Sequence, residues 1–268
     1  MKKLWGGLLL FSSVLCFFTG CKAMPEHANR EMPTIVVGSD IYPPYIYQDS
    51  DGAMTGIDVD IAKEAFRRIG YQVEFSVIDW EQKDVLLETG EIDCIWGCYS
   101  MSGREDDYQW AGPYMVSRQV VAVNKNSPIQ DSMDLEGKKI AVQTTGKPEE
   151  ILLNHLDMRF PENIAVIGLE DRSVQYASLD CGYVDAIAAH ETAILQYVKD
   201  YDADFRILDD AILTTGIGVA FAKEDNRGLA EQIQKTFSDM QADGTMKKIV
   251  GAYLEHPQTY LEVDRLGE

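Results

Sequence analysis

The sequence predicts an α/β protein built from two similar units, and three observations support this. Short β-branched segments alternate with amphipathic segments, which is typical of parallel strands joined by helices. The alternation is interrupted at 112–128 and then begins again. The pattern L-x-x-G-x-[IV]-D-x-I also occurs twice, at 87–95 and at 179–187.

The first unit is expected to follow a β-α-β-α-β order. Its elements are expected to be strand 34–39, helix 56–70, strand 71–78, helix 80–89 and strand 92–98. Some strand segments are continuous runs of β-branched and other apolar residues, and the others alternate apolar with polar residues. The helix segments carry apolar residues on one face, and each is followed by a glycine, Gly70 or Gly90, that can end it.

The second unit repeats this order. Its elements are expected to be strand 137–143, helix 147–156, strand 163–168, helix 172–181, strand 184–189, helix 190–200 and strand 204–208. Pro148 fits the first turn of a helix, and Gly182 stands where Gly90 stands in the first unit. The remaining chain, 226–254, is expected to be helical with a break at Gly244.

The repeated pattern also predicts where a ligand binds. In open α/β sheets, ligands bind beyond the carboxyl ends of the strands. Residues 97–104 and 190–192 follow the two repeated strands, so they are expected to face a ligand. Asp93 and Asp185 lie at the opposite ends, and we expect them to cap or bond the turns there.

Composition and the chain start indicate an extracytoplasmic protein. The formal charge of −20 disfavours nucleic acid and anionic membrane surfaces as partners. Residues 1–20 combine two early lysines with an apolar stretch, 4–18, and are predicted to be a signal peptide. "FTGC" resembles a lipobox, which predicts lipidation of Cys21, a polar tether at 21–33 and attachment to the cell membrane; an ordinary secretory signal is the alternative.

The other cysteines and histidines predict no catalytic or metal site. Cys94, Cys98 and Cys181 are odd in number, so buried free thiols are expected. The four histidines are scattered, and the sequence contains neither H-E-x-x-H nor G-x-S-x-G. We therefore expect no catalytic residues, no cofactor and no metal.

An ordered set of motifs carries a family resemblance over nearly the whole chain after the leader. The motifs are "VVGSDIYPPYIYQDSDGAMTGIDVDIAKEAFRRIGYQVEF", "DWEQKDVLLETGEIDCI", "GRED", "AGPYM", "LEGKKIAVQ" and "QADGTMKKIVGAYL". Together they resemble the bacterial extracellular solute-binding proteins of family 3, which deliver polar amino acids to ABC importers.

The resemblance implies a two-lobed periplasmic-binding-protein fold of type II, with a mostly parallel sheet flanked by helices in each lobe. Lobe 1 would comprise 34–122 and 216–268, and lobe 2 would comprise 123–215. Two hinge crossovers are expected at 121–123 and 216–219. A monomer would close on a small ligand between its lobes, and a membrane permease with its ATPase would receive that ligand.

The resemblance also implies ligand-binding residues, of which Arg104 is the foremost. Arg104 would grip the ligand α-carboxylate beside the start of a helix, unless it is a solvated arginine paired with its acidic neighbours. Two departures from the family pattern affect this stretch: it is one residue short, and Met101 replaces a threonine. The hydroxyl and thiol groups expected to support the carboxylate belong to Cys98, Ser100, Ser102, Thr144 and Thr145, with helix capping as the alternative for the two threonines.

Asp40, Tyr42 and Trp80 would line the side-chain end of the pocket. His190 stands where the family has the aspartate that receives the ligand ammonium, and a neutral imidazole brings no negative charge. Either Glu191 replaces that aspartate, or Glu170 or Asp171 does, or the ligand is not a standard α-amino acid. The aromatic residues expected in the core instead are Trp96, Trp110 and Tyr114.

Two other functions compete with transport. A ligand-sensing module for a membrane receptor would use the same fold and the same cleft. An enzyme similar to cyclohexadienyl dehydratases would need a carboxylate as acid or base, for which Asp40 and Glu191 are the candidates.

Overall fold

The structure is a computed structural model that describes Met1 and residues 32–266. The predicted leader, the predicted lipidation site Cys21 and nearly all of the predicted tether lie outside the described residues. Within the described chain, no helix is both long enough and apolar enough to cross a membrane.

Lobe 1 begins with a β-α-β-α-β unit, as predicted. Its elements are β1 (Thr34–Ser39), β2 (Tyr47–Gln48), β3 (Met54–Thr55), α1 (Ile57–Arg68), β4 (Gln72–Val77), the 3₁₀ turn η1 (Trp80–Gln82), α2 (Lys83–Thr89) and β5 (Cys94–Ser100). Helix α1 buries Ile57, Ile61 and Ala65 on one face, and its acidic first turn and basic last turn complement the helix dipole. The three long strands are parallel in the order β4-β1-β5.

Lobe 2 repeats this topology. Its elements are the 3₁₀ turn η2 (Met133–Leu135), β7 (Lys139–Gln143), α3 (Lys147–Leu153), β8 (Ala165–Leu169), α4 (Arg172–Asp180), β9 (Ala186–His190) and α5 (Glu191–Tyr201). The order β8-β7-β9 is parallel and equivalent to β4-β1-β5. Pro148 lies in the first turn of α3, and the Asp171 side chain caps α4 by accepting a hydrogen bond from Ser173 N.

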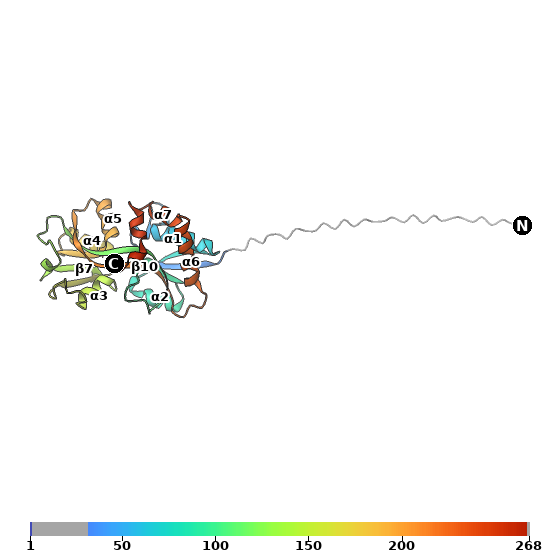
Figure 1. The fold of residues 1–268 in the computed structure, drawn as a ribbon, viewed down its shortest axis with the longest axis horizontal. Coiled ribbons are helices and arrows are strands. Elements are labelled where there is room, and N and C mark those ends of the chain that lie inside the picture. Colours follow the sequence, from blue (N-terminus) through green and yellow to red (C-terminus); the bar gives the residue numbers. More distant parts are fainter. Residues whose placement is uncertain (2–31, 267–268) are drawn as a thin grey trace. The chain divides into compact units, whose positions relative to one another are not determined.

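Two long strands join the lobes into one eight-stranded mixed sheet (Figure 1). These are β6 (Gln109–Asn124) and β10 (Phe205–Phe221), which pair antiparallel along most of their length. β10 pairs with β5 of lobe 1 at 217–220, and β6 pairs with β9 of lobe 2 at 119–123. The segments expected to be crossovers, 216–219 and 121–123, overlap these two stretches, and their role as hinges stays a prediction.

The end of the chain returns to lobe 1. Its elements are α6 (Leu229–Ala242), α7 (Thr245–Val250), α8 (Pro257–Leu261) and the 3₁₀ turn η3 (Val263–Arg265). Leu229, Ile233 and Phe237 of α6 belong to the same buried cluster as Phe66 and Trp96. Lobe 1 is therefore built from both ends of the described chain, and α6 lies beside α1 (Figure 1).

The repeated aspartates hold equivalent strands together. Asp93 donates its backbone N–H to Val36 O over 2.8 Å and accepts from Val36 N at Oδ2 over 2.8 Å. Asp185 makes the same pair of bonds with Lys139, both of 2.9 Å. The carboxylate thus continues the ladder beyond the end of a parallel strand, which confirms a structural role for both residues.

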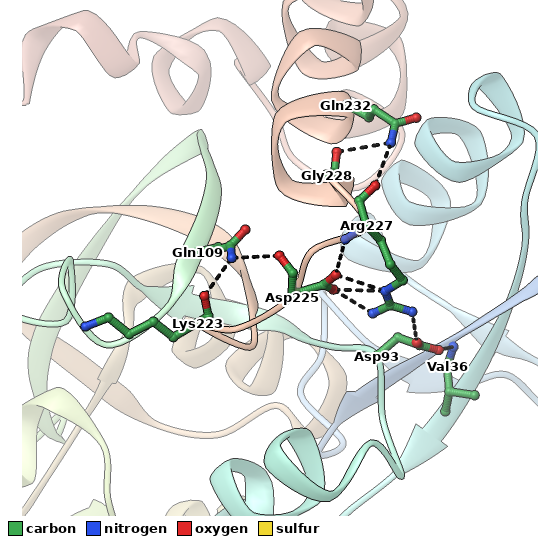
Figure 2. Close-up of polar contacts among 8 residues, drawn as sticks. All are labelled: Val36, Asp93, Gln109, Lys223, Asp225, Arg227, Gly228 and Gln232. Atoms are coloured by element: carbon green, nitrogen blue, oxygen red, sulfur yellow. Dashed lines mark hydrogen bonds and ion pairs between the residues drawn. The ribbon is translucent and has the colours of Figure 1, made fainter.

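Asp93 has a further partner that its counterpart lacks in the described chain. Arg227 lies between Asp93 and Asp225 and forms ion pairs with both carboxylates (Figure 2). Gln109 fixes the same turn by donating to the backbone carbonyls of Lys223 and Asp225. This network ties β5 to the segment that leads into α6.

The cysteine prediction is confirmed for two residues and wrong for the third. Cys94 and Cys98 are buried free thiols, whereas Cys181 is free but exposed. Cys181 follows the last residue of α4, in the turn that leads to β9, so the lobe interior does not cover it.

Candidate functional site

A small cavity lies between the lobes at the carboxyl ends of the parallel strands. β5, β7 and β9 end at Ser100, Gln143 and His190, and all three residues line the cavity. Its volume is about 30 Å³, which is too small for an amino acid. Ligand entry therefore requires the contacts between the lobes to open.

Arg104 reaches across the cavity from lobe 1. Its Nη1 donates to Ser100 O over 3.3 Å, and its Nη2 donates to Thr145 O of lobe 2 over 3.1 Å. The guanidinium lies 5.0 Å from the Tyr99 ring centroid. Both acceptors are neutral carbonyls, and no described carboxylate forms an ion pair with Arg104, so its positive charge is available to an anion.

The prediction that a helix begins beside Arg104 is wrong. The chain forms turns there because Gly103 adopts a left-handed conformation with φ of 69°. Arg104 N donates to Met101 O over 2.9 Å, which closes one of these turns. The site consequently has no helix terminus at this point, and the side chain of Arg104 is the group that attracts an anion.

His190 is buried in the wall of the cavity and is neutral. Burial, and next the charge of Arg172, lowers the pKa of His190 from 6.5 to about 3. Its Nδ1 is 2.6 Å from Ser117 Oγ, and its backbone N–H donates to Tyr42 OH over 3.1 Å. The imidazole therefore offers one hydrogen bond to the cavity and no charge.

Asp40 is bound by two side chains of the opposite lobe. Its Oδ2 accepts from Arg172 Nε over 2.8 Å and from Gln143 Nε2 over 2.6 Å. The Arg172 guanidinium also lies 3.4 Å from the Tyr42 ring centroid, so it covers this aromatic face. Asp40 and Tyr42 do not line the cavity, because Arg172 does.

Two buried lysines, Lys83 of α2 and Lys147 of α3, contact or form the wall of the cavity. Lys83 Nζ donates to Thr145 Oγ1 over 3.2 Å, and burial lowers the pKa of Lys83. Lys147 lines the cavity and donates to both carboxylate oxygens of Glu150, over 2.8 and 2.6 Å. Thr145 itself has a left-handed backbone with φ of 57°, a strained conformation of the kind found at functional sites.

The structure brings most, but not all, of the predicted residues together. Those that line the cavity are Trp80, Cys98, Ser100, Arg104, Thr145 and His190. Ser102 instead bonds Thr215 Oγ1 over 2.8 Å, and Glu191 forms an ion pair with Arg118 over 2.8 Å. The Thr144 hydroxyl is buried outside the cavity wall.

Four polar lining residues were not predicted: Gln119, Gln143, Lys147 and Arg172. Gln143 ends β7, and Arg172 follows β8 by three residues. Applying the strand-end rule to β7 and β8, as well as to β5 and β9, would have identified both.

Asp58 does not line the cavity but bonds the backbone of Cys98, which does. Its Oδ2 accepts from Cys98 N over 2.8 Å, and its Oδ1 accepts from Tyr114 OH over 2.8 Å. Cys98 has a left-handed φ of 50°, so this bond fixes an unusual backbone turn within β5. Burial raises the pKa of Asp58 from 3.8 to about 7. An acidic residue in the first turn of a predicted helix gave no signal of this role.

Comparison with known proteins identifies the family. The model of the bacterial extracellular solute-binding proteins, family 3, matches residues 35–256. The chain belongs to this family. The histidine-binding periplasmic protein of Escherichia coli (strain K12) is 30% identical over 265 residues, which cover 95% of this chain and 98% of that protein.

Solved structures of similar solute-binding proteins have the same fold. An ancestral arginine-binding protein bound to arginine is 28% identical, with a TM-score of 0.75 over 83% of this chain and 98% of that chain. The ancestral amino acid-binding protein AncCDT-1, a precursor of cyclohexadienyl dehydratase, is 24% identical, with a TM-score of 0.74 over 83% of this chain and 96% of that chain. Among the residues that the structure describes, no group of three or more His, Cys, Asp or Glu is placed to hold a metal ion.

Proposed function

We propose that the protein is the substrate-binding component of an ABC importer, which captures a polar amino acid or a close derivative between its lobes. The observation that carries this proposal is the Arg104 guanidinium, which faces the interlobe cavity with only carbonyl oxygens as partners. A carboxylate is the natural partner of such a group, because it accepts two parallel N–H bonds. The histidine-binding relative and the arginine-bound structure support an amino-acid ligand.

Binding would close the lobes around the ligand. Tyr45 OH and Thr192 Oγ1 already lie 2.6 Å apart across the cleft, and Arg104 reaches Thr145 O on the other side. A ligand carboxylate would replace the carbonyl partners of Arg104 while the two lobes enclose it. A membrane permease and its ATPase would receive the ligand from this form. We also propose attachment to the membrane through a lipid on Cys21.

Binding without catalysis is part of the proposal. The two carboxylates that a dehydratase would require are both engaged, Asp40 with Arg172 and Glu191 with Arg118. Each of these carboxylates is thus already bound by a guanidinium of the protein, and neither lines the cavity.

The test is calorimetry of Arg104→Ala with the amino acid that most raises the melting temperature of the wild type in a thermal-shift screen. Loss of the charged hydrogen bonds is expected to weaken binding at least about tenfold. Arg118→Ala is the matched control, since it removes an arginine at the junction of the lobes that does not line the cavity. Equal affinity of the wild type and Arg104→Ala would remove Arg104 from the site.

A further inference from the structure

The wall of the cavity is basic although the chain is strongly acidic. The sequence contains 44 Asp and Glu residues against 24 Lys and Arg. In the described chain, the charged residues that line the cavity are Arg104, Lys147 and Arg172, and none of the lining residues is Asp or Glu. The cavity wall is thus positively charged although the molecule as a whole is negatively charged, and this favours the binding of anionic groups.

Arg172 has side-chain hydrogen-bond donors that no described residue accepts from. Only its Nε is bonded, to Asp40. Its terminal Nη1 and Nη2 groups have no acceptor among residues 32–266, although the side chain is only 11% exposed. A guanidinium with unused donors forms strong charged hydrogen bonds with an anionic acceptor, so an acidic group of the ligand would be bound here. Arg172 is therefore a second guanidinium, distinct from Arg104, that can bind an anion in the same cavity.

A ligand ammonium group finds no comparable partner. The carboxylates that bond side chains of the cavity wall already have partners. Asp40 Oδ2 accepts from Arg172 and Gln143, and both oxygens of Glu150 accept from Lys147. Asp40 Oδ1 is buried without a partner, but Asp40 does not line the cavity. A cationic group must displace Arg172 to reach it.

We propose that the ligand carries two acidic groups, one bound by Arg104 and the other by the terminal nitrogens of Arg172, and that it needs no ammonium group. The ligand class is a small dicarboxylic acid, with or without an α-amino group. This inference rests on the proposed function and narrows its substrate class.

Four compounds separate the chemical groups in a calorimetric titration of the protein. L-Glutamate has two acids and an ammonium group, and glutarate has the two acids alone. L-Glutamine replaces the second acid with an amide, and L-arginine replaces it with a cation. We expect glutamate and glutarate to bind within about tenfold of each other, and glutamine and arginine to bind at least about tenfold more weakly than both.

Arg172→Gln tests the residue assigned to the second acid. This substitution is expected to weaken the binding of glutamate and of glutarate at least about tenfold and to abolish the preference for glutamate over glutamine. Arg159→Gln is the control, because Arg159 is also an ion-paired arginine of lobe 2 but lies outside the cavity. Arg172→Lys keeps the charge and is used if the melting temperature shows that Arg172→Gln does not fold; it is expected to retain the preference for the two acids.

The outcomes separate this inference from the proposed function. Preference for glutamate and glutarate that depends on Arg172 supports both. Stronger binding of glutamine or arginine, or an unchanged preference in Arg172→Gln, would overturn the two-acid ligand while leaving an amino-acid importer in place. No heat and no thermal shift with these four compounds or with any standard amino acid would overturn both.

Discussion

Two buried groups are expected to give the protein opposing pH dependences. Asp58 has a pKa raised from 3.8 to about 7 because burial disfavours its charged form. Between these values the folded state binds more protons than the unfolded state, so the free energy of unfolding falls as pH rises. His190 has a pKa lowered from 6.5 to about 3, chiefly by burial. Between those values the unfolded state binds more protons, so the free energy of unfolding rises with pH.

The two contributions nearly cancel in a window accessible to experiment. Each group contributes up to about 1.4 kcal/mol per pH unit, so between about pH 5 and about pH 6.5 each amounts to roughly 2 kcal/mol, with opposite signs. Asp58→Asn removes the falling contribution, and His190→Gln removes the rising one. Between the two pH values, the free energy of unfolding should rise by roughly 2 kcal/mol in Asp58→Asn relative to the wild type. In His190→Gln it should fall by roughly 2 kcal/mol relative to the wild type.

Urea unfolding of the ligand-free wild type and both variants at the two pH values measures these slopes. The comparison uses differences between proteins, so exposed carboxylates that titrate in the same range contribute equally to all three. The same pH slope in Asp58→Asn and in the wild type would refute a buried, protonated Asp58. The same pH slope in His190→Gln and in the wild type would refute a neutral, buried His190.

Three further predictions concern the fold. Asp93→Ala should lower the free energy of unfolding by about 1–3 kcal/mol and Asp185→Ala by about 1 kcal/mol, because of the two only Asp93 also forms an ion pair with an arginine, Arg227. Equal losses in urea unfolding would contradict the contribution of Arg227. Gly97→Ala should cost about 1–3 kcal/mol, since an added methyl group overlaps Ser39 Oγ; a neutral effect on the melting temperature would contradict this close approach. Cys181 should react with a thiol reagent in the native protein while the two buried thiols react only after unfolding, and peptide mapping that finds equal labelling would contradict their burial.

The architecture was predictable because its signals are local. Glycines after amphipathic segments, such as Gly90 with φ of 76°, end helices, and the following apolar runs have the length of buried strands. The duplicated aspartates could be assigned a structural role because they precede their strands, on the side of the sheet opposite to the site. The exposure of Cys181 was not predictable, since it depends on how α4 lies against its lobe.

The site was predictable only where it depends on the order of elements. Trp80, Ser100 and Arg104 could be placed from motifs and strand ends. The ion pair of Asp40 with Arg172 could not, because it joins residues 132 positions apart in different lobes. Asp40 was predicted to line the pocket, but its negative charge is used by Arg172 and is not available to a ligand. Neither sequence segment by itself indicates this pairing.

A crystal structure of the protein with the ligand that most raises its melting temperature tests the central claim most directly. We expect a ligand carboxylate within hydrogen-bonding distance of the Arg104 guanidinium, in place of Thr145 O, with residues of both lobes around it. A ligand bound outside the cleft, or one inside it that leaves Arg104 on its carbonyl partners, would contradict the account.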